Sequence, residues 1–287
     1  MIALSNPKAE IYFPQGSGDD LHLEQTTHLG VGAHPDDLEI FAIHGILEAY
    51  ADQNKHFTGV TVTDGRGAPR SGDYAGTSDE TLVKIRSSEQ KKSADLGQYN
   101  TQFLLNYTSS SIKSPINPDL VADLKNILTA TSPSIIYTHN LADKHDTHVA
   151  VALTLIQALR DLEPAPRTIK LYGCEVWRGL DWLPDEKKVV LDVSEHITLQ
   201  ENLLSIFESQ ISGGKRYDLA TLGRRLTNAT YFQSHHTDTA SHAVYAMDLT
   251  PLINHPEMDI EAYISKDIND FAADVRERLK RLRKGSV

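Results

Sequence analysis

Residues 27–39, THLGVGAHPDDLE, place an apolar strand directly before one imidazole and two adjacent carboxylates. His34 and Asp37 are three residues apart, so their side chains converge on one side of a first helical turn if Pro35 opens a helix. Asp36, between them, stays free to act as a general base. This stretch therefore predicts a strand-to-helix turn that presents metal ligands.

Residues 145–148, His-Asp-Thr-His, form a second cluster that can supply a third ligand. A catalytic zinc keeps three protein ligands and an open position for water, and His34, Asp37 and His148 fit that need. Each cluster alone also fits a structural role, because a His-x-x-His pair on a helix is common by chance and an aspartate near a helix start is often an N-cap.

His145 lies one helical turn before His148 on the same side of the expected helix, so it faces the pocket without needing to bind metal. It would stabilise a developing oxyanion or protonate a leaving amine. Asp143 is close enough in sequence to orient it. Asp36, as general base, would take a proton from the attacking water.

Short β-rich segments alternate with longer helical patterns, which is typical of βαβ units and a mainly parallel, doubly wound α/β sheet with helices on both faces. The expected strands are 27–33, 57–63, 101–105, 134–138, 168–174 and 188–193, and the expected helices are 36–52, 79–97, 118–131, 145–162 and 195–211. Such sheets bind ligands outside the carboxyl ends of their strands. His34 ends the first strand and His139 the fourth, so the two clusters should meet there.

The chain of 287 residues is interpreted as a single domain, 1–287, with a core at about 25–212 and C-terminal additions at 213–287. The additions include a basic helical stretch, an alternating HAVYAMDL segment and a charged amphipathic helix at 259–284. Residues 64–78 lack periodicity and predict a long loop beside the ligand edge, either a substrate lid or a passive connection.

The net charge of −11 argues against a nucleic-acid or anionic-membrane surface. Cys174 is the single cysteine, which excludes an internal disulfide framework and suits a reducing compartment. No stretch resembles a targeting segment or a membrane span, so we expect a cytoplasmic protein. The basic C-terminal residues are expected from the helix dipole alone, with contact to RNA or a membrane as the alternative.

The segment Ala33–Glu39, AHPDDLE, resembles the signature of the PIG-L/LmbE-like family of zinc-dependent N-deacetylases. The resemblance continues in family order over roughly residues 25–212. It is carried by Thr63-Asp64-Gly65, Arg86-Ser87-Ser88-Glu89, Ala94-Asp95-Leu96-Gly97, His139 to His148, Leu191-Asp192-Val193 and Ser209-Gln210.

This resemblance implies a Rossmann-like fold with one Zn²⁺ per chain on His34, Asp37 and His148, and Asp36 as the base. It also implies that Arg86 contacts the substrate, often at a phosphate or sugar oxygen. Judged from its own surroundings in the sequence, Arg86 is only one charge on a solvated helix face.

The second motif departs from the family pattern, which usually reads His-Pro-Asp-His. Thr147 stands where a carboxylate often supports the histidine, and Asp143 or Asp146 would have to replace that carboxylate. Asp143 and His139 are the expected supporting residues. Some family members polarise the carbonyl with a tyrosine, for which the candidates here are Tyr217, Tyr231 and Tyr245.

The predicted activity is hydrolysis of an N-acetyl group on an amino sugar or its conjugate, a small-molecule substrate. Trp177 and Arg178, with Trp182, are expected to form a wall that stacks on a sugar and holds an anion. The alternatives are a non-catalytic sugar- or metal-binding protein on the same fold and an amidase acting on small thiol conjugates. A homo-oligomer is also possible, with the C-terminal helix as a contact surface.

Overall fold

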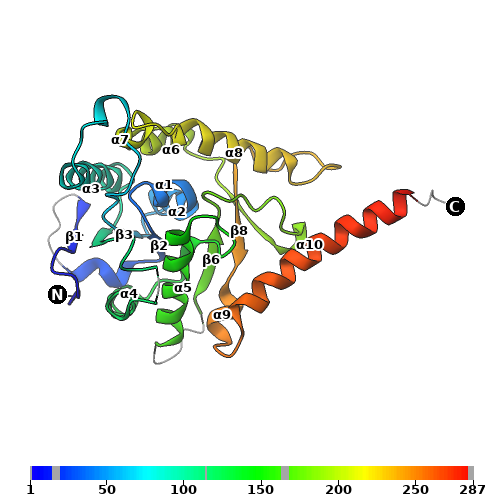
Figure 1. Cartoon of the computed structure of the whole chain (residues 1–287), viewed down its shortest axis with the longest axis horizontal. Coiled ribbons are helices and arrows are strands. Elements are labelled where there is room, and N and C mark those ends of the chain that lie inside the picture. Colours follow the sequence, from blue (N-terminus) through cyan, green and yellow to red (C-terminus); the bar gives the residue numbers. More distant parts are fainter. Residues whose placement is uncertain (1, 15–19, 114, 163–167, 284–287) are drawn as a thin grey trace.

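The described part of the chain builds one eight-stranded sheet in the order β1-β4-β3-β2-β5-β6-β8-β7 (Figure 1). The structure is a computed structural model and describes residues 2–14, 20–113, 115–162 and 168–283. The strands are β1 (Glu10–Tyr12), β2 (His28–Gly32), β3 (Phe57–Thr63), β4 (Thr101–Tyr107), β5 (Ile135–His139), β6 (Lys170–Cys174), β7 (Lys188–Asp192) and β8 (Ala243–Asp248).

The five central strands, from β4 to β6, run parallel. Both edges are antiparallel, because β1 pairs with β4 on one side and β8 lies between β6 and β7 on the other. The predicted α/β class with a mainly parallel sheet is confirmed.

Helices cover both faces of this sheet, and alternate strand residues point into the two layers. The longer α-helices are α2 (Ile43–Ala51), α3 (Asp79–Leu96), α4 (Pro118–Thr131), α5 (Asp146–Arg160), α6 (Ile197–Ser205), α8 (Tyr217–Tyr231) and α10 (Ile260–Arg283). The short ones are α1 (Asp37–Phe41), α7 (Glu208–Ile211) and α9 (Thr250–Asn254). Val31 and Val60 pack with α4 and α5 on one face, whereas Phe57 and Tyr137 pack with α1, α2 and α6 on the other.

Local signals account for the clearest helix boundary. The Asn117 side chain accepts hydrogen bonds from the backbone N–H groups of Asp119 and Leu120, and Pro118 occupies the first turn. Both features favour a helix start at this point, because they satisfy or remove donors that the first turn leaves without partners.

Two expected helices are interrupted. The predicted helix 36–52 is divided at Ala42 into α1 and α2, and α1 begins at Asp37, so Pro35 does not open it. The predicted helix 195–211 is divided into α6 and α7 after Ser205. All five residues of α1 are buried, so tertiary packing decides how it ends.

The chain crosses from one side of the sheet to the other at β2. Its neighbours are β3, which follows it in sequence, and β5, which returns on the opposite side. In doubly wound sheets, ligands bind outside the carboxyl ends of the strands at such a switch point. His34 follows β2 and the 145–148 cluster follows β5, so the two halves of the predicted site lie together.

The last two long helices, α8 and α10, differ in where they lie relative to the sheet. The start of α8 lies over this ligand edge, whereas α10, drawn in orange to red, runs out from the sheet (Figure 1). None of the described helices combines the length and the apolar composition needed to cross a bilayer.

Candidate metal centre and cavity

The turn after β2 is held by the carboxylate of Asp37. Its Oδ2 accepts the backbone N–H of His34 at 2.7 Å and lies 3.2 Å from His34 Nδ1. Asp36 has a φ of 100° in this turn, a conformation that a non-glycine residue adopts at a cost of roughly 1–3 kcal/mol. Its backbone N–H donates to Gln90 Oε1 at 3.2 Å, which helps to hold the strained residue in place.

Three ligand-type side chains converge beside this turn. His148 Nε2 lies 3.2 Å from His34 Nδ1 and 3.5 Å from Asp37 Oδ1. Two ligand atoms at 2.0–2.2 Å from one tetrahedral zinc are separated by about 3.3–3.6 Å. The separations in this cluster are close to those values, so His34, Asp37 and His148 fit a zinc ion.

The protonation of these residues also suits a metal. Burial lowers the pKa of His34 to about 4 although Asp37 opposes the shift, so the imidazole is neutral at neutral pH. Burial raises the pKa of Asp37, but His148, His139 and His34 together hold it well below its usual range. A neutral imidazole and an ionised carboxylate are the forms that bind metal.

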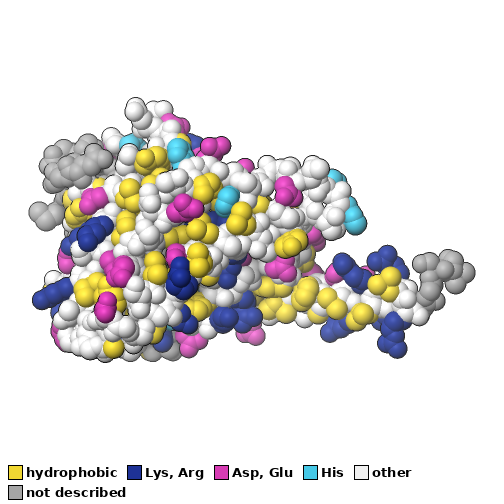
Figure 2. All heavy atoms as spheres, turned by 90° about the horizontal axis from the view of Figure 1, so that it is seen from above, with side chains coloured by type: hydrophobic (Ala, Val, Ile, Leu, Met, Phe, Trp, Pro, Cys, Tyr) yellow, Lys and Arg dark blue, Asp and Glu magenta, His cyan; other side chains and the backbone are white. Residues whose placement is uncertain are grey.

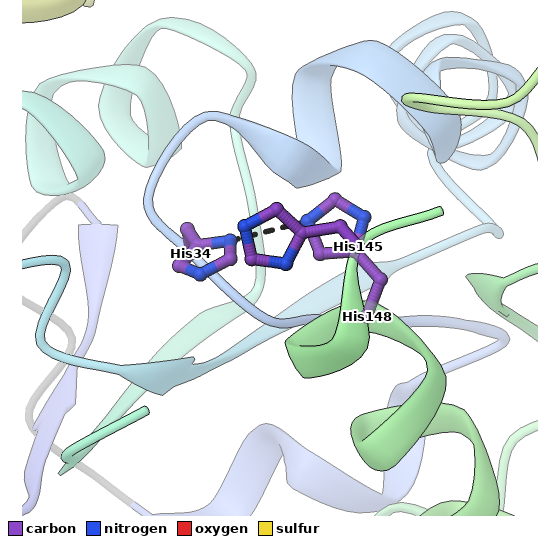
Figure 3. Close-up of side chains that lie close together, drawn as sticks. All are labelled: His34, His145 and His148. Carbon is purple, nitrogen blue, oxygen red and sulfur yellow. Dashed lines mark hydrogen bonds between the residues drawn. The ribbon is translucent and has the colours of Figure 1, made fainter. Parts of the chain in front are cut away.

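His145 lies directly beside this cluster. Its ring stacks on that of His148 with centroids 4.6 Å apart and meets the edge of His34 at 5.0 Å. Figure 3 shows the three rings gathered together, with the hydrogen bond between His34 and His148 dashed. One ring nitrogen of each lies within 4.8 Å of the others, so His145 is near enough to contact either a metal or its substrate.

His139 lies beneath the cluster and its Nε2 is already occupied. This atom accepts the backbone N–H of Ala33 at 2.9 Å, and the ring stacks on His148 at 3.8 Å. A nitrogen that accepts a hydrogen bond has no lone pair for a metal. The geometry therefore gives His139 a supporting position.

Asp143 takes the supporting position beside His148, for which the second motif has Thr147 in place of a carboxylate. Its Oδ2 lies 3.5 Å from His148 Nδ1 and accepts the backbone N–H of Trp177 at 3.1 Å. Its Oδ1 accepts the backbone N–H of His145, so Asp143 orients that residue through the main chain. Asp146 is exposed, whereas Thr147 is buried and lines the cavity.

The carboxylate of Asp36 is paired with a buried cation. Arg86 Nη2 lies 3.1 Å from Asp36 Oδ2 and also donates to the carbonyl oxygen of Pro35, and Nη1 donates to that of Gly65 at 3.0 Å. Arg86 is therefore not on a solvated face. Gly65 has a φ of 69°, and a Cβ atom there would lie 2.7 Å from Arg86 Nη1, so only glycine fits this contact.

A cavity of about 380 Å³ opens above these groups. Its floor includes His34, Asp36 and Asp37, and Arg86 and His145 are in its wall. The loop after β3 contributes Gly65, Gly67, Ala68 and Pro69, whereas Trp177 and the α8 residues Tyr217, Ala220, Thr221 and Arg224 close the opposite side. The remaining lining residues include Lys113 and Gln210.

The structure brings some of the other predicted residues to this cavity and leaves others outside. Trp177 lines it, but Arg178 is exposed and is not among the described residues that do, so the expected pairing of the two in one wall is wrong. Trp182 is partly buried and packs against the hydrophobic core instead. Of the three tyrosines, Tyr217 lines the cavity; Tyr231 is exposed and Tyr245 donates its hydroxyl to Asn228.

Lys113 and Arg224 are cavity residues that the sequence did not identify. Arg224 has a detectable signal in retrospect, because Tyr217, Thr221 and Arg224 are spaced four and three residues apart and so share one face of α8. Lys113 lies in a loop without periodicity, and no local pattern indicates it.

Arg225 joins α8 to α1, the helix that carries the candidate ligand Asp37. It is fully buried, and its Nη2 donates to the carbonyl oxygens of Glu39 at 2.6 Å and Ile40 at 3.2 Å, while Nη1 donates to Gln200 Oε1 at 2.8 Å. Burial without a carboxylate partner lowers the pKa of Arg225 to about 9. The outer wall of the cavity is thereby tied to the helix that carries Asp37.

Residues 29–159 match the family described as PIG-L: GlcNAc-PI de-N-acetylase. The matched range holds both clusters and Arg86 but ends before α8. The resemblance to the PIG-L/LmbE-like family is confirmed. A search of curated proteins finds no match.

Solved structures share the fold at low sequence identity. The N,N'-diacetylchitobiose deacetylase from Pyrococcus horikoshii has a TM-score of 0.62 at 16% identity, over 83% of this chain and 90% of that chain. The conserved protein TT1542 from Thermus thermophilus has 0.60 at 18%, over 82% and 99%. GalB, the 4-carboxy-2-hydroxymuconate hydratase from Pseudomonas putida, has 0.59 at 15%, over 78% and 96%. Since a deacetylase and a hydratase share this fold, the fold alone does not select the reaction.

Proposed function

We propose that this chain, whose residues 29–159 carry the PIG-L family match, is a zinc-dependent hydrolase that removes the acetyl group from an amino sugar or amino-sugar conjugate. The observation that supports it most is the convergence of His34, Asp37 and His148 at metal-ligand separations beside an unligated carboxylate, Asp36. A carboxylate that faces the cavity beside such a cluster is the group that a metal hydrolase needs as its general base.

Zinc bound by His34, Asp37 and His148 would supply a Lewis acid and lower the pKa of water to about 7. Asp36 accepts the proton of the attacking water. Burial raises the pKa of Asp36, and Arg86 opposes that rise, so the carboxylate combines basicity with a fixed orientation.

Hydrogen-bond donors on the opposite wall of the cavity stabilise the negative charge that develops on the acetyl oxygen. Tyr217 carries a hydroxyl on this wall, and burial raises its pKa, so it remains a proton donor at neutral pH. His145 is the second candidate donor to that oxygen, and the alternative role for it is to pass a proton to the leaving amine. Trp177 offers an aromatic face on which a sugar ring can stack.

The test is acetate release by the zinc-loaded protein from N-acetylglucosamine, its phosphate ester and N,N'-diacetylchitobiose. We expect release from at least one of them, loss on chelation and recovery on addition of Zn²⁺. Asp36→Asn should keep its zinc and lose ~100 to 10,000-fold in turnover. His34→Ala should lose both zinc and activity.

Other results would separate the alternatives. Zinc and sugar binding without acetate release would favour a non-catalytic binding protein. Release only from N-acyl thiol conjugates would favour the amidase. Full activity in Asp36→Asn would show that the assigned base is wrong.

A further inference from the structure

The helix α10 packs on the body only through its first turns. Ile264 and Asp267 are its buried residues, and no described residue of the helix beyond Asp267 is buried. Figure 1 shows the helix leaving the sheet, and Figure 2 shows hydrophobic side chains running along the projecting arm between basic ones. About 24 Å of this helix, residues 268–283, therefore lies free of the rest of the chain.

The free part carries a narrow apolar stripe. Its members are exposed by 40–70% and are Ile268, Phe271, Val275, Leu279 and Leu282. Their spacings of three, four, four and three residues keep them within one face of a straight helix, because each residue advances by about 100°. A continuous apolar stripe that no other described part of the chain covers marks an interaction surface.

The stripe is symmetric about Val275. Ile268 and Leu282 lie seven residues to either side of it, and Phe271 and Leu279 lie four residues to either side. When two such helices lie antiparallel on a twofold axis at Val275, every stripe residue meets another stripe residue. We propose that this face binds the α10 helix of a second copy of this chain in that arrangement, forming a C2 dimer.

The charges beside the stripe favour the antiparallel direction. On one flank, Asp274 precedes Val275 and Arg278 follows it, and the two form an ion pair of 3.0 Å along the helix. In an antiparallel pair this flank faces the same flank of the other copy, so Asp274 lies near the partner subunit's Arg278 and Arg278 near the partner subunit's Asp274. In a parallel pair this flank would instead face the opposite flank of the other copy, which carries Arg276 and Arg283, so Arg278 would lie near like charges.

The same charges argue against a membrane as the occupant. Basic residues cluster only near the end of the helix, and Asp274 lies beside the stripe, where an anionic surface would repel it. The paired length is short for a permanent interface, so we expect a dimer that dissociates on dilution.

Cysteine cross-linking tests the contact directly, because the single native cysteine, Cys174, is buried and unpaired. Val275→Cys places two thiols on the twofold axis, and oxidised glutathione should link them into a covalent dimer. Ala273→Cys is the matched control, since Ala273 is exposed on the opposite face of the same helix turn. Equal cross-linking of the two variants would overturn the proposal.

Mixed variants test the direction. Ile268→Cys and Leu282→Cys should each stay largely unlinked alone and form a mixed disulfide when combined. Homodisulfides of Ile268→Cys, without the mixed product, would overturn the antiparallel arrangement.

Light scattering across a range of concentrations completes the test. The wild-type chain should shift from monomer to dimer as concentration rises, and Val275→Lys should remain a monomer with unchanged helical content. A wild-type chain that stays monomeric, or a Val275→Lys chain that still dimerises, would contradict the proposal. A stripe-dependent binding of the monomer to phosphatidylserine vesicles would assign the face to a membrane instead.

Discussion

The guanidinium of Arg86 lies 3.1 Å from Asp36 Oδ2, and both side chains are buried and line the cavity. A hydrogen bond to a charged group contributes about 1.5–3 kcal/mol, which corresponds to roughly 10–100-fold in rate when it is needed in the transition state. Arg86→Gln should therefore lower kcat by that factor while zinc content stays near that of the wild type. Arg66→Gln is the control, because Arg66 pairs with Asp64 and does not line the cavity. An equal effect of both changes would mean that Arg86 acts only on folding.

Tyr217 is expected to donate to the acetyl oxygen, and loss of one such donor typically costs ~100 to 1,000-fold in kcat. Tyr217→Phe should show this loss with little change in thermal unfolding. Tyr245→Phe should do the opposite, since its hydroxyl bonds to the buried carbonyl oxygen of Asn228. Steady-state kinetics and unfolding curves of the two variants compare them directly, and unchanged kinetics in Tyr217→Phe would remove the residue from the mechanism.

Asp143 faces the ring nitrogen of His148 that does not point to the metal position. Second-sphere partners of this kind alter metal affinity by about 10–100-fold. Asp143→Asn should weaken zinc binding by that amount in competition with a chromophoric chelator. Asp146→Asn changes an exposed residue three positions further on and should bind zinc as tightly as the wild type. If Asp146→Asn weakens zinc binding more than Asp143→Asn does, the assignment of Asp143 as the residue that supports His148 is wrong.

His28 predicts how stability depends on pH. Burial, reinforced by His44, lowers its pKa to about 4 from an ordinary value of 6.5. Between these values the unfolded chain binds a proton that the folded chain does not, so His28 destabilises the fold as the pH falls through this window. The contribution is about 3 kcal/mol over the whole window. His28→Gln should flatten the acid side of the stability curve measured by denaturant titration, and an unchanged slope would contradict the assignment.

The central sheet was predictable because its signals are local. Each predicted strand is present, and the strand 57–63 and the helix 118–131 have the predicted bounds. β1 was missed because it has only three residues and none of them is buried, so no apolar pattern marks it. Its pairing with β4 is made by backbone groups. The break at Ala42 was missed because no glycine or proline marks it and the surrounding residues are uniformly apolar.

The site was predictable to the extent that its residues follow strands. His34, Asp36 and Asp37 follow β2 directly. The carboxyl ends of parallel strands lie at the same edge of the sheet, so the second cluster, which follows β5, lies beside them. The buried position of Arg86 depends on Gly65 and Pro35, which are distant in sequence, so its helix pattern alone gives a solvated residue. Arg178 was assigned to the cavity by its neighbour Trp177, but adjacent residues in an irregular segment need not point the same way.

The anchoring of α8 by Arg225 divides the cavity between two stretches of the chain that can be altered separately. The candidate metal ligands and Asp36 all lie before residue 149, whereas α8 contributes Tyr217, Thr221 and Arg224 to the opposite wall. Substitutions at Thr221 and Arg224 can reshape that wall without touching the candidate ligands or Tyr217, provided that Arg225 still holds the helix in place. Under the proposed function, we therefore expect changes on this face of α8 to alter substrate selectivity while the candidate metal site stays intact.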